Sequence, residues 1–425
     1  MSAATTTGPT RTRGPLAELF LGGGAARRAL WILVGLMLLL SVVRVISGEQ
    51  ALTSASTFST ALLLAVPIGL AALGGLFSER AGVVNIGLEG MLILGTWGAG
   101  WAGYQWGWAG AIVGGILFGV AGGLVHAIAT VTFGVDHVVS GVAINILAAG
   151  IVRFLSELVY VGNELGGGAT QSPALSSRPP SFSLPVLSDG PDLLGDLADQ
   201  GWFLISDVAG LLRGVTSGVG VLTLIAVLLI PISYVVLWRT AFGLRLRSCG
   251  ENPAAADSLG VPVYRMKYIA VLISGGLAGL GGVALVFVAN IFKEGQTGGR
   301  GFIGLAALIF GNWRPGGLAA GAGLFGFADG LQLRSRTAVV ALLLLLALLL
   351  LAVAVFQTVR GRYLQAVLAA AFAGLSLVGF LTIDELPTGI VSFTPHLTTL
   401  LVLSLASQRL RMPKADGLVY RRGEN

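Results

Sequence analysis

The chain has 425 residues, of which 55% are hydrophobic and only 11% are charged, and its formal net charge is +6. A soluble globular domain carries about 25% charged residues, so this composition excludes an ordinary soluble fold and predicts a protein that crosses a membrane repeatedly. The single cysteine, Cys249, excludes an intrachain disulfide. In a membrane protein a basic excess marks cytoplasmic loops, so we expect no nucleic-acid partner.

The first apolar run, ALWILVGLMLLLSVV, follows Arg27 and Arg28 and looks like the charged and apolar regions of a signal peptide. No A-x-A-like cleavage site follows it, and more apolar runs come later. We therefore interpret it as an uncleaved first helix that follows a cytoplasmic tail of residues 1–28.

Further apolar runs predict an all-α, polytopic transmembrane bundle within residues 29–409. Residues 301–312 are too short to span a bilayer unaided, so we expect a half-helix there. Most Lys and Arg residues fall on one side when both termini are cytoplasmic, which predicts a multi-pass protein of the cytoplasmic (inner) membrane. The expected segments, about 12 in number, are 29–46, 57–77, 82–104, 107–131, 137–158, 215–238, 268–291, 301–312, 315–333, 338–358, 363–382 and 390–408.

Two hydrophilic segments interrupt these runs. Residues 160–214 are rich in Pro, Ser, Gly and Asp and form an external loop in this topology, within which GWFLISDVAGLLRGV predicts a short interfacial helix. Residues 239–267 form a cytoplasmic loop that is basic at both margins. The tail 410–425 is also predicted to be cytoplasmic.

The stretch SERAGVVNIGLEG, residues 78–90, places polar groups between two apolar runs. Glu79 and Arg80 lie at the cytoplasmic boundary, where charge is cheap. Asn85 and Glu89 are spaced i, i+4, which would put them on one helical face, and Glu89 is deep enough to need a partner or water. A solute pathway and a buried structural network both explain this pair. Asn145, in GVAINILAAG, adds an amide to another apolar run.

The cytoplasmic loop contains CGENPAAADSLGVPVYRMKY. Asn252 as an N-cap and Pro253 at the first helical position predict a short helix between Gly250 and Gly260. A capped internal helix favours a docking element for a partner over an ordinary loop between spans, because such loops are usually shorter.

Residues 295–330 have a glycine density that breaks helices. A short helix, the turn NWRPGG and a Gly- and Ala-rich span indicate a discontinuous element near a pathway. Its polar members are Asn290, Asn312 and Asp329. Tight glycine-mediated packing is the alternative explanation.

Motifs for chemistry are missing from the sequence. No phosphate-binding G-x-x-x-x-G-K-[ST] loop, no H-E-x-x-H and no G-x-S-x-G nucleophile motif occurs, and the three histidines are scattered. We therefore expect a transport subunit without a cofactor or metal of its own.

Three long runs resemble permease subunits of ATP-binding-cassette (ABC) importers, in the branch for simple sugars, branched-chain amino acids and nucleosides. The likeness is greatest to nucleoside permeases served by a basic-membrane-protein-type lipoprotein. The tail PKADGLVYRRGE is a fourth, weaker match. The runs are ERAGVVNIGLEGMLILGTWGA, FGLRLRSCGENPAAADSLGVPVYRMKYIAVLISGGLAGLGG and GRGFIGLAALIFGNWRPGGLAAGAGLFGFADGLQLR.

The resemblance implies that an ATPase, which binds ATP and Mg²⁺, docks on the cytoplasmic coupling helix. It also implies a second permease subunit, often a sister chain in a heterodimer, and an external substrate-binding lipoprotein, with membrane lipid around the bundle. The expected coupling residues are Gly250, Glu251, Asn252, Ala255, Ala256, Asp257 and Gly260. The expected residues of the translocation pathway are Asn85, Glu89, Asn145, Asn290 and Asn312.

We therefore expect half of an importer channel for nucleosides. A sugar or amino acid substrate for the same machine, or an ion-coupled secondary transporter, are the alternatives. The chain departs from the usual pattern in the long loop 160–214, which could contact the binding protein, and in an extra helix pair over 337–385. A pair of spans keeps the C-terminus on the same side, and peripheral packing against lipid is its expected role.

Overall fold

The computed structural model of the chain describes residues 25–383 and 410–423. Helices form nearly all of the regular structure in these residues, and the single β-ribbon consists of two short antiparallel strands. In chain order the elements are α2 (Ala25–Ser47), η1 (Gln50–Leu52), α3 (Ala55–Arg80), α4 (Leu88–Ala127), η2 (Ile128–Thr132), α5 (His137–Val159), β1 (Ser181–Phe182), α6 (Leu193–Asp199), α7 (Ile205–Thr216), β2 (Val219–Gly220), α8 (Val221–Arg239), α9 (Ala241–Glu251), α10 (Pro253–Ser258), α11 (Val263–Ala289), α12 (Arg300–Phe310), α13 (Pro315–Arg334), α14 (Arg336–Val359) and α15 (Tyr363–Thr382).

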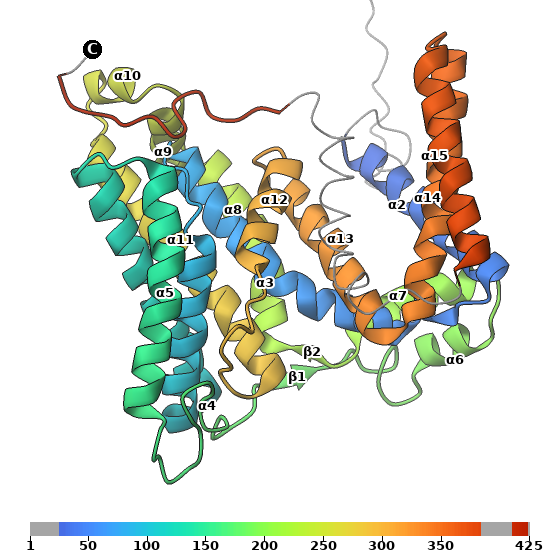
Figure 1. Cartoon of the computed structure of the whole chain (residues 1–425), viewed down its shortest axis with the longest axis horizontal. Coiled ribbons are helices and arrows are strands. Elements are labelled where there is room, and N and C mark those ends of the chain that lie inside the picture. The colour runs from blue at the N-terminus through green and yellow to red at the C-terminus, as the bar shows by residue number, and fades with distance from the viewer. Residues whose placement is uncertain (1–24, 384–409, 424–425) are drawn as a thin grey trace, which may run out of the picture.

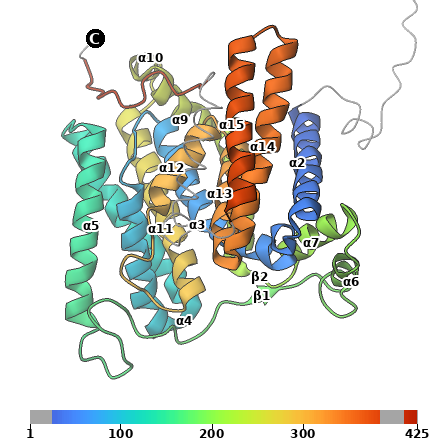
Figure 2. The same cartoon turned by 45° about the vertical axis from the view of Figure 1, so that its right-hand side comes forward.

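The bundle has two ends, which we name by the elements they carry (Figure 1). The α10 face carries α9, α10 and residues 410–423, at the top of the figure. The β-ribbon face carries α6, α7, β1 and β2, at the bottom. Helix α5 stands at one edge of the bundle, and α2, α14 and α15 stand together at the other edge (Figure 2).

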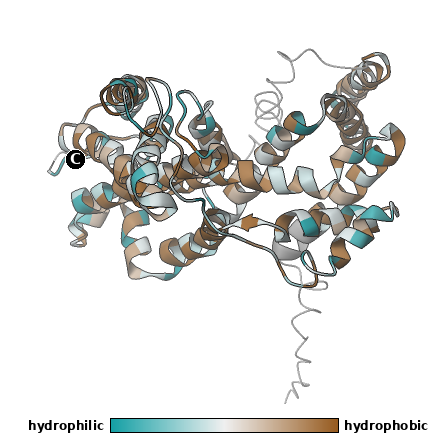
Figure 3. Cartoon of the chain, turned by 90° about the horizontal axis from the view of Figure 1, so that it is seen from below, coloured by the Kyte–Doolittle hydropathy of each residue, from teal (hydrophilic) through white to brown (hydrophobic). Residues whose placement is uncertain are grey.

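Within the described residues, seven helices are long and apolar enough to cross a membrane, so the chain is a polytopic helical membrane protein. Each predicted segment from 29–46 to 363–382 contains a helix, although the helices do not fill every segment, and 390–408 lies outside the described residues. The full count of about 12 segments therefore stays a prediction. Apolar side chains such as Leu158 and Val367, which are 70% and 66% exposed, lie on the edge helices, where lipid can cover them. Figure 3 shows hydrophobic residues along most of the long helices.

Helix α4 is a hairpin of two antiparallel limbs, which confirms the predicted break between 104 and 107. The turn is at Gly107, whose φ of 71° and ψ of −165° suit glycine alone. A Cβ atom on Gly98, in the first limb, would lie 2.6 Å from the carbonyl oxygen of Gly114 in the second. The first limb starts at Leu88, six residues later than predicted, because residues 82–87 form an irregular turn after α3.

Glycines hold α4 against α11 at the centre of the bundle. A Cβ atom on Gly95 would lie 2.4 Å from Gly279 Cα, and one on Gly279 would lie 2.2 Å from the carbonyl oxygen of Gly115. Both limbs of α4 therefore meet the backbone of α11 at nearly the same level. Such close approach replaces the hydrophobic effect as the source of helix association within a membrane.

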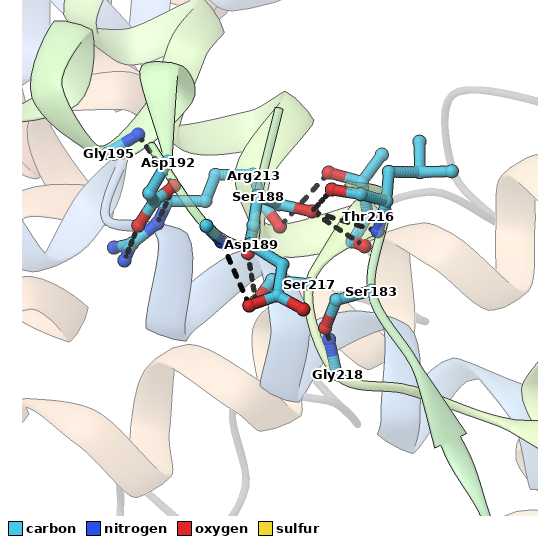
Figure 4. A network of polar contacts seen from close by, with 11 residues as sticks. Ser183, Ser188, Asp189, Asp192, Gly195, Arg213, Thr216, Ser217 and Gly218 are labelled. Carbon is cyan, nitrogen blue, oxygen red and sulfur yellow. Dashed lines mark hydrogen bonds and ion pairs between the residues drawn. The ribbon is translucent and has the colours of Figure 1, made fainter. Parts of the chain in front are cut away.

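The predicted external loop 160–214 is folded rather than irregular. It contains β1, α6 and most of α7, and the helix expected in GWFLISDVAGLLRGV is α7. Arg213 pairs with Asp192, and Gly218 N donates to Ser183 Oγ at 2.8 Å (Figure 4). A buried ion pair between Arg44 Nε and Asp207 Oδ1, 2.8 Å apart, ties α2 to α7. This small subdomain thus has fixed positions relative to the first helices.

We predict that Gly279→Ala destabilises the protein by about 1–3 kcal/mol, because the added methyl group must push the α4 backbone away. Gly276→Ala, one turn earlier, meets side chains rather than backbone, Val120 Cγ2 at 3.2 Å and Ile116 Cγ2 at 3.6 Å, and is the matched control. The control should be close to neutral, since alanine also favours the helix by about 1 kcal/mol. Thermal unfolding of both variants in detergent measures the difference, and equal midpoints would contradict this packing.

Candidate functional site

The carboxylate of Glu89 caps the half-helix α12. Glu89 lies in the first turn of α4, is 6% exposed, and accepts Gly299 N at 3.0 Å and Gly301 N at 2.6 Å. The first N–H groups of a helix have no partner within it, and the helix dipole favours negative charge at that end. Glu89 therefore anchors the start of α12 inside the bundle.

Asn85 lies in the irregular turn before α4, so the expected shared helical face with Glu89 is wrong. The turn leaves α3 at Gly82, where φ is 81°, and residues 83–85 are not helical. Asn85 is fully buried, and its Nδ2 donates to Ser274 Oγ of α11 at 2.8 Å. This hydrogen bond holds the turn against α11.

Asn145 of α5 clamps the same turn from the other side. Its Nδ2 donates to the carbonyl oxygen of Ile86 at 3.0 Å, and its Oδ1 accepts Gly90 N at 2.7 Å. The ring of His126 adds a bridge, since its nitrogens lie 2.9 Å from Ser140 Oγ and 3.0 Å from the carbonyl oxygen of Val84. The predicted amides thus brace the backbone that presents Glu89.

The other two predicted pathway residues lie elsewhere. Asn290 ends α11 with a left-handed φ of 59°, a conformation that asparagine tolerates. Asn312 lies in the turn between α12 and α13, and its Oδ1 accepts Arg411 N at 2.7 Å. The structure brings Asn85, Glu89 and Asn145 together around one turn but does not add Asn290 or Asn312 to that cluster.

The sequence named Asp329 as a polar residue of this element, but it did not predict that Asp329 pairs with Arg300 beside the start of α12. Arg300 Nη2 lies 3.0 Å from Asp329 Oδ2, with exposed side-chain fractions of 19% and 6%, and Gln332 Nε2 donates to Asp329 Oδ1 at 3.1 Å. Among the described atoms, Arg300 Nε and Gln332 Oε1 are buried without a hydrogen-bond partner. An arginine just before an apolar half-helix was the available signal. Two acids from neighbouring helices, Glu89 and Asp329, and one base, Arg300, therefore lie around the start of α12 within the bundle.

The short helix predicted between Gly250 and Gly260 forms as α10, with its cap as expected. Asn252 Oδ1 accepts Ala255 N at 3.0 Å, and Pro253 is the first helical residue. Ala255 is exposed, Ala256 is 2% exposed and packs inward, and Gly260 ends the element with a φ of 81°.

The remaining predicted coupling residues take different positions. Gly250 is packed so that a Cβ atom would lie 2.3 Å from the carbonyl oxygen of Arg80, whereas Glu251 is exposed. Asp257 pairs with Arg422 of the C-terminal segment. Leu259, which the sequence reasoning missed, is 85% exposed. Ala255 and Ser258 of α10, together with Leu259 directly after it, thus face outward.

Residues of the C-terminal segment join this face. Asp416 is 8% exposed and lies near Glu79 and Lys267; burial and the carboxylate of Glu79 raise the pKa of Asp416 above its usual range. Burial also raises the pKa of the Cys249 thiol to about 11, which keeps that thiol neutral. Within the described residues, no group of three or more His, Cys, Asp or Glu side chains could hold a metal ion.

The sequence of the chain is similar to those of known permeases. Residues 57–353 match the sequence profile of the permease component of branched-chain amino acid transport systems. The chain is 40% identical over 280 residues to the guanosine ABC transporter permease of Bacillus subtilis, covering 64% of this chain and 80% of that protein. No solved structure matches significantly.

Two further relatives differ in their named substrates. The nucleoside ABC transporter permease of Lactococcus lactis is 30% identical over 368 residues, covering 84% of this chain and 94% of that protein. A glucose ABC transporter permease of Haloferax volcanii is 25% identical over 272 residues, covering 62% and 65%.

We predict that Glu89→Ala loosens α12 and impairs transport, because the N–H groups of Gly299 and Gly301 lose their acceptor, at a cost of about 1–3 kcal/mol. Hydrogen exchange of residues 299–304 should accelerate, while exchange in α13 stays unchanged. Glu157→Ala, which removes a half-exposed helical acid, is the control. Unchanged exchange at the start of α12 would show that its position does not depend on Glu89.

Proposed function

Because the chain belongs to the family of permease components of branched-chain amino acid transport systems, we propose that it forms half of the membrane channel of an ABC importer for nucleosides. The profile covers residues 57–353, most of the chain. As a permease subunit it is a transport protein rather than an enzyme. The observation that carries the nucleoside assignment is the similarity to two permeases named for guanosine and nucleosides, one of them over 94% of its length.

The proposed machine has three partners. An ABC ATPase subunit that binds ATP and Mg²⁺ docks on α10. A second permease subunit, which is a sister chain in a heterodimer, completes the channel. An external lipoprotein delivers the solute. We place the chain in the cytoplasmic membrane with the α10 face and both termini inside. Arg247, Arg265 and Arg422 on that face support this orientation.

The β-ribbon face is then external. Its folded segment 160–214 presents apolar side chains, including Trp202 at 54% exposure and Phe203 at 49%. A binding protein or the lipid surface could cover such residues. Helices α14 and α15 pack on each other and lie at the edge of the bundle, which supports a lipid-facing role for the extra pair.

The start of α12 is the part of the proposed pathway with the strongest physical support. Arg300, Asp329 and Gln332 place hydrogen-bonding groups at the end of a half-helix, and Glu89 holds that end in position. Broken helices in transporters present such ends to solutes near the membrane midplane. We propose that Asn85 and Asn145 act on the pathway through the turn that they brace, and that Asn290 and Asn312 act at the two ends of the segment that contains α12.

A sugar is the second candidate substrate, because one relative is named as a glucose permease. Nucleosides and sugars both carry ribose- or pyranose-type hydroxyl groups, which suit the same kinds of donors and acceptors. Family membership counts against an ion-coupled carrier, since permeases of this type work with a separate ATPase.

Transport by the complete complex tests the proposal. The two permease subunits, the ATPase and the lipoprotein in membrane vesicles should take up radiolabelled guanosine or uridine only when ATP is present. An imposed ion gradient without ATP should give no uptake. Uptake of glucose but of neither nucleoside would show that the substrate is a sugar. Uptake driven by an ion gradient alone would show that the transporter is ion-coupled rather than ATP-driven.

We predict that Leu259→Asp weakens association with the ATPase at least about tenfold, because it places a charge on a highly exposed apolar residue directly after the proposed docking helix. Val359→Asp is the matched control, since Val359 is 82% exposed at the end of α14, away from α10. Co-purification of the ATPase at graded concentrations measures the effect. Equal association of both variants would argue against docking at α10.

A further inference from the structure

The C-terminal residues 410–423 cross the α10 face without forming a helix or strand and bind several other segments. Near the start, Arg411 N donates to Asn312 Oδ1, in the turn between α12 and α13, at 2.7 Å. Halfway along, Ala415 N donates to the carbonyl oxygen of Gly250 at 2.8 Å. This strap therefore links the α12–α13 turn to the segment that leads into α10.

The middle of the strap is buried rather than laid on the surface. Ala415 and Asp416 are 6% and 8% exposed. A Cβ atom on Gly82 would lie 3.1 Å from the carbonyl oxygen of Ala415, so the strap passes directly over the turn after α3. Lys267 Nζ donates to the carbonyl oxygen of Gly82 at 3.2 Å and supports the same turn from α11. Removal of the strap would open this region to water.

The buried end of α3 continues the connection to α12. Trp313 Nε1 donates to Glu79 Oε2 at 2.5 Å, and Arg80 Nη2 donates to the carbonyl oxygen of Trp313 at 2.7 Å. Asp416 lies against Glu79. The strap, the end of α3 and the end of α12 thus form one polar junction.

The far end of the strap binds the coupling helix. Arg422 Nε lies 3.1 Å from Asp257 Oδ2, and the backbone N–H of Arg422 donates to Tyr264 Oη at 3.3 Å. The rings of Tyr264 and Tyr420 are 5.6 Å apart. Arg422 also borders a groove of about 350 Å³ between the end of α10 and the start of α11. The Arg422 side chain is 75% exposed, so it faces the same solvent as the outward side of α10.

We propose that residues 410–423 and α10 form a single docking surface for the ATPase, and that the strap carries movement of α10 to the α12–α13 turn. This inference rests on the proposed docking of the ATPase at α10. The ATPase is the occupant that the observations favour, because the groove and Arg422 are continuous with the exposed residues of α10.

Charge reversal at the outer end of the strap provides the first test. In the complete complex, Arg422→Asp and Asp257→Arg should each lower ATP-dependent uptake about threefold, and the double variant should restore part of it. Arg362→Asp, an exposed reversal in the turn between α14 and α15, is the control and should transport normally. Single variants that transport as well as the control would overturn the proposal.

Deletion of residues 411–425 provides the second test. Uptake and solute-stimulated ATP hydrolysis should fall at least about tenfold, with the permease still present in the membrane. Hydrogen exchange of residues 418–423 in the intact chain should slow when the ATPase is added. A docking role would be excluded if hydrogen exchange of residues 418–423 did not change on addition of the ATPase and the deletion variant kept normal solute-stimulated ATP hydrolysis. This conclusion would hold even if the deletion lowered stability.

The results separate this inference from the proposed function. If the unmodified complex shows no ATP-dependent nucleoside uptake but ATPase binding still slows exchange in the strap, the substrate assignment fails and the docking surface stands. If the unmodified complex transports nucleosides and the strap variants match it, the docking surface fails alone.

Discussion

Backbone N–H groups at the start of α12 must find acceptors inside the protein, because this half-helix begins among other helices where water is scarce. Glu89 provides two acceptor oxygens, and its own position depends on the turn that Asn85 and Asn145 brace. That turn in turn lies against α11, which approaches α4 through glycines. The position of α12 in the bundle therefore depends on the packing of α4 against α11, on the turn before α4, and on the Glu89 carboxylate that this turn holds in place.

The same constraint explains why the polar residues of the bundle serve structure and transport together. A charge within the bundle is expensive unless it is paired, so Glu89 binds a helix end and Asp329 binds Arg300. Movement of α12 would change both interactions at once. In the proposed pathway, the polar interactions around α12 therefore depend on the position of that helix.

Local signals in the sequence predicted the parts of the fold that depend on neighbouring residues. The N-cap at Asn252, the break before Gly107 and the short helix after Gly299 were all visible, because capping, turns and helix length are encoded nearby. The shared face of Asn85 and Glu89 was wrong, since spacing alone does not reveal that the chain is irregular after Gly82. The contact between Glu89 and Gly301, and that between Asp257 and Arg422, join residues far apart in the sequence, which no local pattern could show.

The buried place of Ala415 and Asp416 has a consequence for synthesis of the protein. Helices α3, α9 and α11 leave the ribosome long before these residues are made. Until then, the carbonyl oxygen of Gly250 lacks the donor that Ala415 later supplies. The α10 face of the bundle is thus completed only after residues 410–423 have been made, so an ATPase that recognises the finished surface would not bind shorter nascent chains.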